Sequence, residues 1–211
     1  MARLTRKEKQ AHTRSCLMKS AAKVFARRGL QHASIDEVAE DAGFTKGAFY
    51  ANFRSKEELF LAMLDQRFAE RIEEIDRVME THAEPAQQAR QIAADFLRYL
   101  GADPDWQRIF FEFTAYAARN DPFREELVTR YKTLRARIAD AYRQKQEELG
   151  VTLPVPVEQI ALMTFAMANG IALEKLLEPE AVSDELYATM LTAFFEGLRA
   201  MAESSEPAVT S

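Results

Sequence analysis

Cysteine, histidine, glycine and proline are all scarce in this sequence of 211 residues. The single cysteine, Cys16, cannot form a disulfide within the chain, which favours a reducing compartment and a cytoplasmic location. The three histidines, His12, His32 and His82, are scattered, and none has the spacing of a metal-ligand pair, so no metal site is predicted. With only seven glycines and seven prolines, long regular elements with few breaks are expected.

Long apolar runs and catalytic motifs are also missing. The longest nearly apolar stretch, residues 160–173, is interrupted by Thr164 and Asn169 and is shorter than the roughly 20 residues that cross a bilayer. The sequence has no glycine-rich phosphate loop and no nucleophile elbow. We therefore expect no membrane partner, no cofactor and no catalytic residues.

Charge is distributed unevenly along the chain. Residues 1–60 contain 12 basic and 7 acidic side chains, whereas the whole chain has a net charge of −5. A basic N-terminal region on an acidic body indicates that only the N-terminal region meets a polyanion. Charge alone leaves open the alternative that these cations form a solvated helix face.

Helical periodicity runs through nearly the whole chain, and no segment alternates convincingly with a period of two. The sequence therefore predicts an all-α fold. Gly29 is a plausible stop for the first helix, and Ser34-x-x-Glu37 and Ser55-x-x-Glu58 have the pattern of capping boxes. The expected helices cover residues 7–28, 34–43, 45–52, 56–81, 86–100, 104–118, 122–149, 157–178 and 183–203.

The segment 34–53 has the pattern of a helix-turn-helix. Small Ala39 permits two short helices to cross closely, and Gly43, four residues later, can take positive φ in the turn. Phe49 falls on the inward face of the next helix beside Val38, and Phe53 closes the same small core.

The outward side chains of that second helix suit entry into the major groove of DNA. Thr45 adds a hydroxyl donor at the helix N-terminus, Lys46 can reach a phosphate or a guanine edge, and Gly47 permits close backbone approach. The full set of expected DNA contacts is Ser34, Thr45, Lys46, Gly47, Tyr50, Asn52, Lys56 and Arg14. The alternative is a helical hairpin in an ordinary bundle, with these side chains merely exposed.

The run from Phe44 to Leu59, Phe-Thr-Lys-Gly-Ala-Phe-Tyr-Ala-Asn-Phe-Arg-Ser-Lys-Glu-Glu-Leu, closely resembles the DNA-binding region of TetR/AcrR-family regulators. The preceding Ala-Ala-Lys-Val-Phe-Ala-Arg-Arg-Gly29 and Ser34-Ile-Asp-Glu-Val-Ala match the first two helices of that family, and the resemblance covers residues 10–65. Asn52 stands where most of the family has His, which changes the contact expected at this position.

The resemblance implies a protein of about nine helices with two domains. Residues 1–54 would form the three-helix DNA-binding domain, and residues 55–204 a domain for ligand binding and dimerisation. Residues 205–211, small and polar, are expected to be a disordered tail. In the family, the residues that match Thr45, Lys46, Tyr50 and Lys56 typically contact DNA.

The resemblance also implies a small-molecule pocket in the body. Aromatic residues on two neighbouring helices are its candidates, although an aromatic stripe is more often core packing. The expected ligand contacts are Phe96, Tyr99, Trp106, Phe110, Phe113, Tyr116 and Asn169. Glu112 is a further polar candidate, with a solvated position as its alternative, and Asn169 has an interhelical hydrogen bond as its alternative.

The helices near 157–178 and 183–203 carry surplus apolar surface, which favours a homodimer through both of them over burial within one subunit. The leading hypothesis is a repressor that binds a palindromic, double-stranded operator as a dimer and is released by a small, largely apolar effector. The alternative is a helix-turn-helix architectural or protein-interaction module without a ligand switch. A helical enzyme would need a catalytic constellation, and the sequence shows none.

Overall fold

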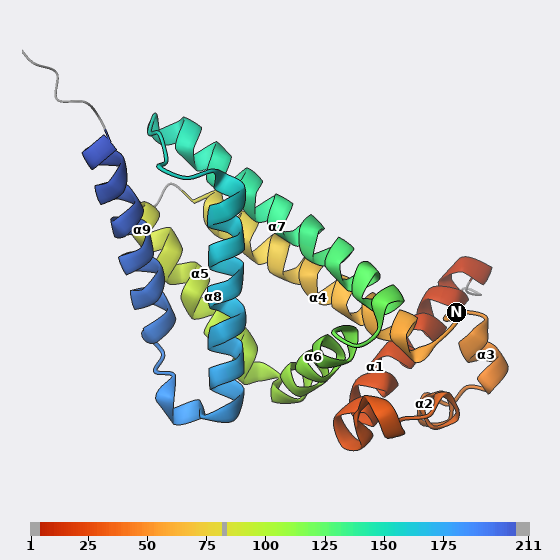
Figure 1. Cartoon of the computed structure of the whole chain (residues 1–211). Coiled ribbons are helices and arrows are strands. Elements are labelled where there is room, and N and C mark those ends of the chain that lie inside the picture. Colours follow the sequence, from red (N-terminus) through yellow and green to blue (C-terminus); the bar gives the residue numbers. More distant parts are fainter. Residues whose placement is uncertain (1–4, 82–83, 206–211) are drawn as a thin grey trace, which may run out of the picture. The chain divides into compact units, whose positions relative to one another are not determined.

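The computed structural model describes residues 5–81 and 84–205, and within these ranges it contains helices and no strand. The predicted all-α fold is confirmed (Figure 1). The expected tail lies outside the described residues except for residue 205. The helices are α1 (Arg6–His32), α2 (Ile35–Asp41), α3 (Lys46–Tyr50), α4 (Lys56–Met79), α5 (Pro85–Ala102), α6 (Pro104–Ala117), α7 (Asp121–Leu149), α8 (Val157–Leu177), the 3-10 turn η1 (Pro179–Ala181) and α9 (Leu186–Ser205).

Side-chain caps set the start of the short helices. The Ser34 hydroxyl accepts a hydrogen bond from the N–H three residues later at 3.1 Å, and the Thr45 hydroxyl accepts one in the same way at 3.2 Å. The predicted capping box at Ser34 is only half formed, because the carboxylate of Glu37 pairs with Arg27 at 2.7 Å instead. Each cap still satisfies one of the free N–H groups of the first turn.

Gly29 breaks α1 without ending it. Its φ of 72° and ψ of 168° are not helical, yet a further turn continues to His32. Gly29, which was predicted to end the first helix, therefore kinks it instead. Positive φ is rare for residues with a Cβ, so this backbone path favours glycine.

The described chain packs as two compact units. The first contains the residues up to Ala69 together with Pro104–Val128, and the second contains Glu70–Asp103 together with the residues from Thr129 onward. This grouping differs from the division expected at residue 54, because α6 packs directly against α1 (Figure 1). Buried aromatic rings hold this packing: Phe113 on α6 lies 5.4 Å from Phe25 on α1, between ring centroids.

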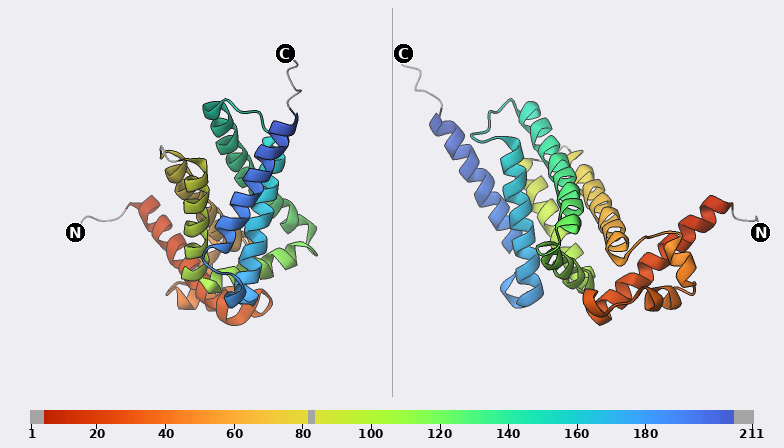
Figure 2. Two further views of the ribbon diagram at one scale, coloured as in Figure 1. Left: turned by 90° about the vertical axis from the view of Figure 1, so that its left-hand side faces the viewer. Right: turned by 45° about the vertical axis from the view of Figure 1, so that its right-hand side comes forward.

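In the second unit, α5 and α9 lie side by side (Figure 2). The ring of Phe96 on α5 packs against Tyr187 on α9 at 5.4 Å, and the Tyr142 hydroxyl donates to the Thr164 hydroxyl at 3.2 Å. Burial raises the pKa of Tyr142 to about 12, so its hydroxyl stays protonated and remains a donor.

Helix α8 differs from the sequence-based expectation in one respect. By length and composition it is apolar enough to cross a membrane. Only 28% of its most apolar stretch is buried within the protein. One such helix is weak support for a membrane protein, because helices of soluble proteins meet the same criteria. Several large apolar side chains of α8, among them Leu162 and Leu177, are exposed.

Candidate nucleic-acid interface

The turn between α2 and α3 is built as the sequence predicts. Gly43 has a φ of 73°, and the N–H of Phe44 donates to the carbonyl of Ala39 at 2.8 Å. Ala39 is buried at the crossing of the two helices. The turn thus fixes the angle between α2 and α3 without bulky side chains between them.

A small apolar core supports α3 from behind. Phe49 is fully buried, and its ring centroid lies 5.8 Å from that of Phe53 and 5.6 Å from that of Tyr50. Val38 on α2 and Leu17 on α1 are buried as well. Because the inner face of α3 is anchored in this core, its other face is held at a fixed orientation toward solvent.

Thr45, Lys46, Gly47 and Tyr50 are all exposed on that outer face. Half of the Tyr50 side chain is accessible to solvent. A Cβ added at Gly47 would meet only the Thr45 hydroxyl at 3.7 Å, so packing within the protein does not require glycine there. The missing side chain instead leaves the backbone accessible to a partner from outside.

Lys46 has an ionic partner in the free protein. Its ammonium donates to the carboxylate of Asp36 at 2.9 Å, and both side chains are more than half exposed. The hydrogen bond and negative charge of Asp36 raise the pKa of Lys46, so the ammonium stays charged. Exposed pairs of this kind are weak and can exchange for another anion at little cost.

Three further expected DNA contacts donate hydrogen bonds to backbone carbonyls of the protein. Arg14 donates to the backbone carbonyl of Asn52 at 3.0 Å and lies 4.1 Å above the ring of Phe53. The Asn52 amide donates to the carbonyl of Ala48 at 2.8 Å. Lys56 donates to the carbonyl of Leu30 at 2.5 Å. DNA contacts by Arg14, Asn52 and Lys56 therefore remain predictions, and they require these internal bonds to be exchanged or shared.

Comparison with protein families assigns the chain to a class of proteins. Residues 17–63 match bacterial regulatory proteins of the tetR family, and residues 85–200, more than half of the chain, match the C-terminal part of BetI-type transcriptional repressors. The chain belongs to the TetR family. Members of this family are helix-turn-helix transcriptional regulators and not enzymes, so this is the class of the present protein.

Individual relatives support the assignment, and each is similar to a different share of the chain. The HTH-type transcriptional regulator TtgR of Pseudomonas putida is 30% identical over 193 residues, which span 86% of this chain and 88% of the relative. The transcriptional activator FasR of Mycolicibacterium smegmatis is 32% identical over 110 residues, about half of each chain. The structure of FadR from Bacillus subtilis in complex with stearoyl-CoA has a TM-score of 0.70 at 13% identity and covers 91% of this chain and 99% of FadR, which shows a shared fold.

The aromatic residues expected to line a pocket in this TetR-family regulator are divided between the two compact units. In the first unit, Trp106, Phe110 and Phe113 are buried, and Trp106 and Phe113 both stack on Phe60. Tyr116 is half-buried, and its hydroxyl accepts a hydrogen bond from Asn120 at 2.8 Å. Phe113 thus belongs to a closely packed stack rather than to a free surface.

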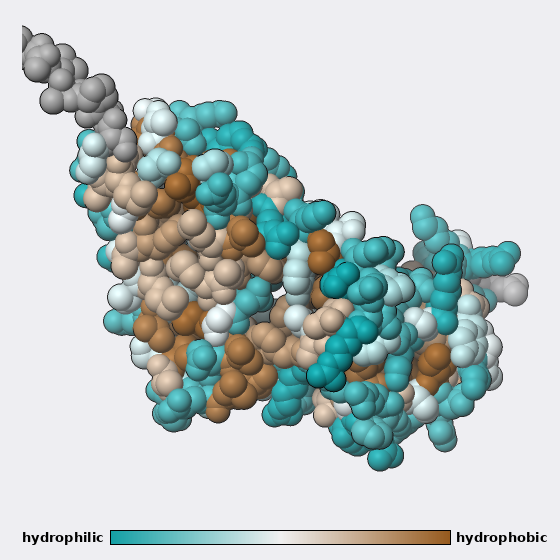
Figure 3. Space-filling view, viewed as in Figure 1, coloured by the Kyte–Doolittle hydropathy of each residue, from teal (hydrophilic) through white to brown (hydrophobic). Residues whose placement is uncertain are grey.

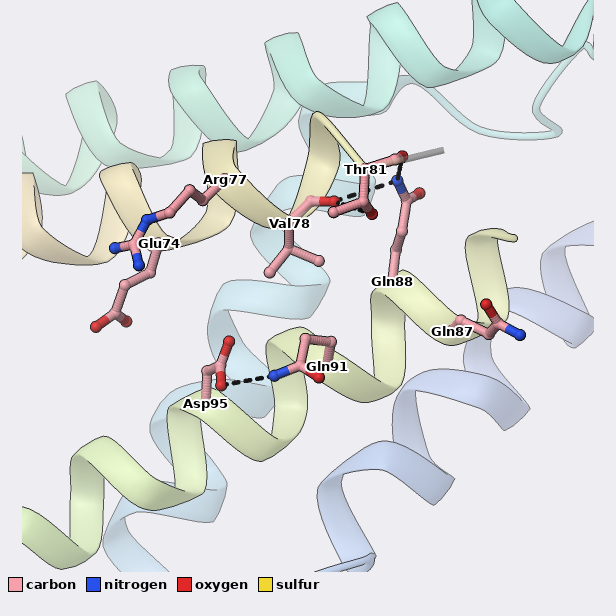
Figure 4. A pocket seen from close by; sticks show the side chains of 8 residues that line it. All are labelled: Glu74, Arg77, Val78, Thr81, Gln87, Gln88, Gln91 and Asp95. Atoms are coloured by element: carbon pink, nitrogen blue, oxygen red, sulfur yellow. Dashed lines mark hydrogen bonds between the residues drawn. The ribbon is translucent and has the colours of Figure 1, made fainter. Parts of the chain in front are cut away.

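The other expected ligand contacts lie in the second unit. Phe96 and Tyr99 are half-buried on α5 beneath the guanidinium of Arg71, and Asn169 is half-buried on α8. A pocket of about 440 Å³ does open in this unit between the end of α4 and α5 (Figure 4). Its lining is mainly polar, with Glu74, Arg77 and Asp95 among the charged groups, and includes none of the expected aromatic residues.

Sequence reasoning missed one buried amide, Gln107 on α6. Only 6% of Gln107 is exposed, and within the described residues its amide nitrogen has no hydrogen-bond partner. A buried amide without a partner destabilises the folded state by about 1–3 kcal/mol, so such groups are retained mainly where a ligand or water can use them. The only signal in the sequence is one amide among the aromatic residues of 106–111.

Replacing Gln107 with Met is expected to leave the free energy of unfolding unchanged or to raise it by about 1 kcal/mol, because an unpaired amide is removed. The matched control is Gln88, which is equally buried but donates to the carbonyls of Met79 and Thr81 at 3.2 and 2.9 Å. Gln88→Met is expected to lower the free energy of unfolding by about 1–3 kcal/mol. Urea denaturation of both variants measures the difference, and equal losses would show that Gln107 is satisfied in solution.

Proposed function

We propose that this TetR-family regulator is a cytoplasmic repressor that binds a palindromic operator as a dimer and releases it when a small effector binds. The observation that carries the proposal is the outer face of α3, where Thr45, Lys46, Gly47 and Tyr50 are exposed while Phe49 anchors the inner face. A recognition helix needs this combination of rigid support and accessible donors. Ser34, at the N-terminus of α2, would hold a neighbouring phosphate.

Surplus apolar surface on α8 supports the dimer. The residues Leu162, Ala166, Gly170, Leu173 and Leu177 are exposed and follow one another at helical spacings of three and four, so they form one stripe, here called the α8 stripe. Apolar colours gather over α8 and α9 in Figure 3. A contiguous apolar stripe of this kind is typical of an interaction surface, and a second copy of the same surface is its simplest partner.

An effector that releases the operator is supported by relatives rather than by a bound ligand. Residues 85–200 are similar to the C-terminal part of BetI-type transcriptional repressors, and FadR, which shares the fold, was solved in complex with stearoyl-CoA. We propose residues 1–54 as the DNA-reading part and 55–204 as the effector and dimer part, with the unpaired Gln107 as a donor toward an oxygen acceptor of the effector. The name of FasR makes activation the second candidate for the outcome of binding.

Selection of bound duplexes from a random pool by the purified protein tests the proposal. We expect one palindromic sequence to be enriched, with half-site centres separated by about one helical turn (~34–36 Å) or a longer interval. An architectural module without specificity would instead retain duplexes at low salt and enrich none of them. Retention of no duplex at all would contradict DNA binding through α3.

The Lys46→Ala variant is expected to bind the selected operator about three- to tenfold more weakly, because one phosphate contact is lost. The dependence of the logarithm of affinity on the logarithm of salt concentration should become shallower by about one. Fluorescence anisotropy at several salt concentrations measures both quantities.

Lys132→Ala is the matched control, since it removes the same charge from an exposed position on α7 in the other unit. It is expected to leave the salt dependence unchanged. A loss for Lys46→Ala that is confined to one base position would assign this lysine to a base edge instead of a phosphate.

A further inference from the structure

We propose that Glu112 is a positioning residue for DNA binding: its carboxylate fixes the end of α1 and, through α1, the place of α3. This inference rests on the proposed function of α3, and Glu112 itself is not among the expected DNA contacts. All of the groups involved lie in the first compact unit.

The kink at Gly29 creates the group that Glu112 holds. Because the backbone of Gly29 is not helical, the N–H of Leu30 points out of the helix and donates to Glu112 at 2.7 Å. A Cβ at Gly29 would lie only 2.9 Å from the same carboxylate oxygen. Positive φ favours glycine here, and any side chain would also have to displace the Glu112 carboxylate.

The carbonyl group of Leu30 is held by a cation, the ammonium of Lys56. Lys56, the first residue of α4, donates to the carbonyl of Leu30 at 2.5 Å and lies 3.4 Å from that of Ala33. Leu30 therefore has its N–H bound to an anion on α6 and its C=O bound to a cation on α4. Hydrogen bonds with one ionised partner are roughly twice as strong as neutral ones, and both of these are partly buried.

Nearer its N-terminus, α1 contacts the residues that follow the recognition helix. Arg14 donates to the carbonyl of Asn52, just beyond the end of α3, and stacks on Phe53. Between Arg14 and the kink, α1 is an unbroken helix with Leu17, Ala21, Val24 and Phe25 buried. At about 1.5 Å per residue, the unbroken stretch from Arg14 to Arg28 spans roughly 21 Å, and Gly29 joins it directly to Leu30, so a shift imposed at Leu30 can reach the residues after α3.

This arrangement gives α6 a mechanical connection to the DNA-reading face. Glu112 lies next to Phe113, whose ring stacks on Phe60 of α4, so the carboxylate moves with a tightly packed helix. Coupling between two sites requires a physical connection with a measurable energy. The bonds at Leu30 and Asn52 are two of the points where α1 can pass such a displacement on, beside the ion pairs of Arg27 and Arg28 with Glu37 on α2.

Two variants of similar side-chain length test the inference. Glu112→Gln keeps an oxygen that can accept from Leu30, whereas Glu112→Met keeps the length and removes the acceptor. We expect Glu112→Gln to bind the selected operator within about twofold of the wild type and Glu112→Met to bind about tenfold more weakly. The salt dependence should stay unchanged in both, since no phosphate contact is lost.

Amide hydrogen exchange at Leu30 gives a readout that does not depend on DNA. We expect at least about tenfold faster exchange in Glu112→Met and nearly unchanged exchange in Glu112→Gln, because only the former leaves the N–H without its acceptor. Unchanged exchange in Glu112→Met would overturn the inference. If the wild type selects no duplex, the proposed function fails, while the exchange measurement still decides the contact at Leu30.

A double-mutant cycle separates transmission through α1 from local loosening. Arg14→Ala releases α1 from Asn52 and also removes the expected DNA contact of Arg14, but that second loss occurs in both halves of the cycle and cancels. The double variant Arg14→Ala/Glu112→Met is therefore expected to weaken binding by clearly less than the product of the two single effects. Once the bond between α1 and Asn52 is lost, loss of the bond at Leu30 has little further effect on the position of α3. Independent, multiplicative losses would overturn the role of α1 as the connection.

Discussion

Leu162→Asp is expected to make the protein monomeric and to weaken its binding to a two-half-site operator by at least about 100-fold. Leu162 lies in the α8 stripe with half of its side chain exposed. A carboxylate there would have to be buried without a partner in the dimer, which costs several kcal/mol in each subunit. Each DNA-binding domain would then have to find its half-site independently, without the high effective concentration that the dimer provides.

Sedimentation velocity and anisotropy with one-half-site and two-half-site duplexes measure this effect. Leu149→Asp is a matched control, because Leu149 is also half exposed but lies at the end of α7 and outside the stripe. The control should remain dimeric and bind normally. If Leu162→Asp stays dimeric with wild-type affinity, the dimer uses another surface. If it becomes monomeric but still binds the full operator tightly, the dimer is not needed for recognition.

Phe113→Ala is expected to lower the free energy of unfolding by about 3–5 kcal/mol. The Phe113 side chain is fully buried, and its ring lies 3.7 Å from that of Phe60, between centroids, in a parallel stack. Phe25 and Phe123 enclose it from two other elements. Truncation would leave a cavity among rings that cannot collapse into it, which is the costly case for a core substitution.

Urea denaturation measures this loss, and Phe111→Ala is the neighbouring control. Phe111 is only half-buried, so its truncation should cost clearly less. The same experiment tests the expectation from sequence that Phe113 contacts an effector. A variant with nearly wild-type stability and an altered response to a ligand would identify Phe113 as part of a binding cavity instead of the core.

The short-range features of the helix-turn-helix were predictable because each depends on residues close together in sequence. Ser34 and Thr45 cap the helices they precede, and Gly43 takes the positive φ expected in the turn. Phe49 is buried as its position in the helix-turn-helix pattern requires. Such signals act within one or two helical turns, so no tertiary information is needed to interpret them.

The partners of long charged side chains were not predictable in the same way. Arg14 and Lys56 are expected to reach DNA, and the sequence did not indicate that both also donate to backbone carbonyls of the protein. A flexible cation can reach solvent, a phosphate or a nearby carbonyl, and its sequence neighbours do not distinguish these partners. Glu112 illustrates the same problem, because its partner, Leu30, is 82 residues away.

The sequence by itself determined the all-α architecture, the position of the helix-turn-helix and the face of α3 that is exposed, because helical periodicity and capping are local properties. Only the tertiary structure decided that α6 packs against α1, that Phe113 lies in a closed aromatic stack and that Leu30 is held between Glu112 and Lys56. These outcomes depend on which elements far apart in sequence meet in space, and on which of several apolar or charged faces each element buries.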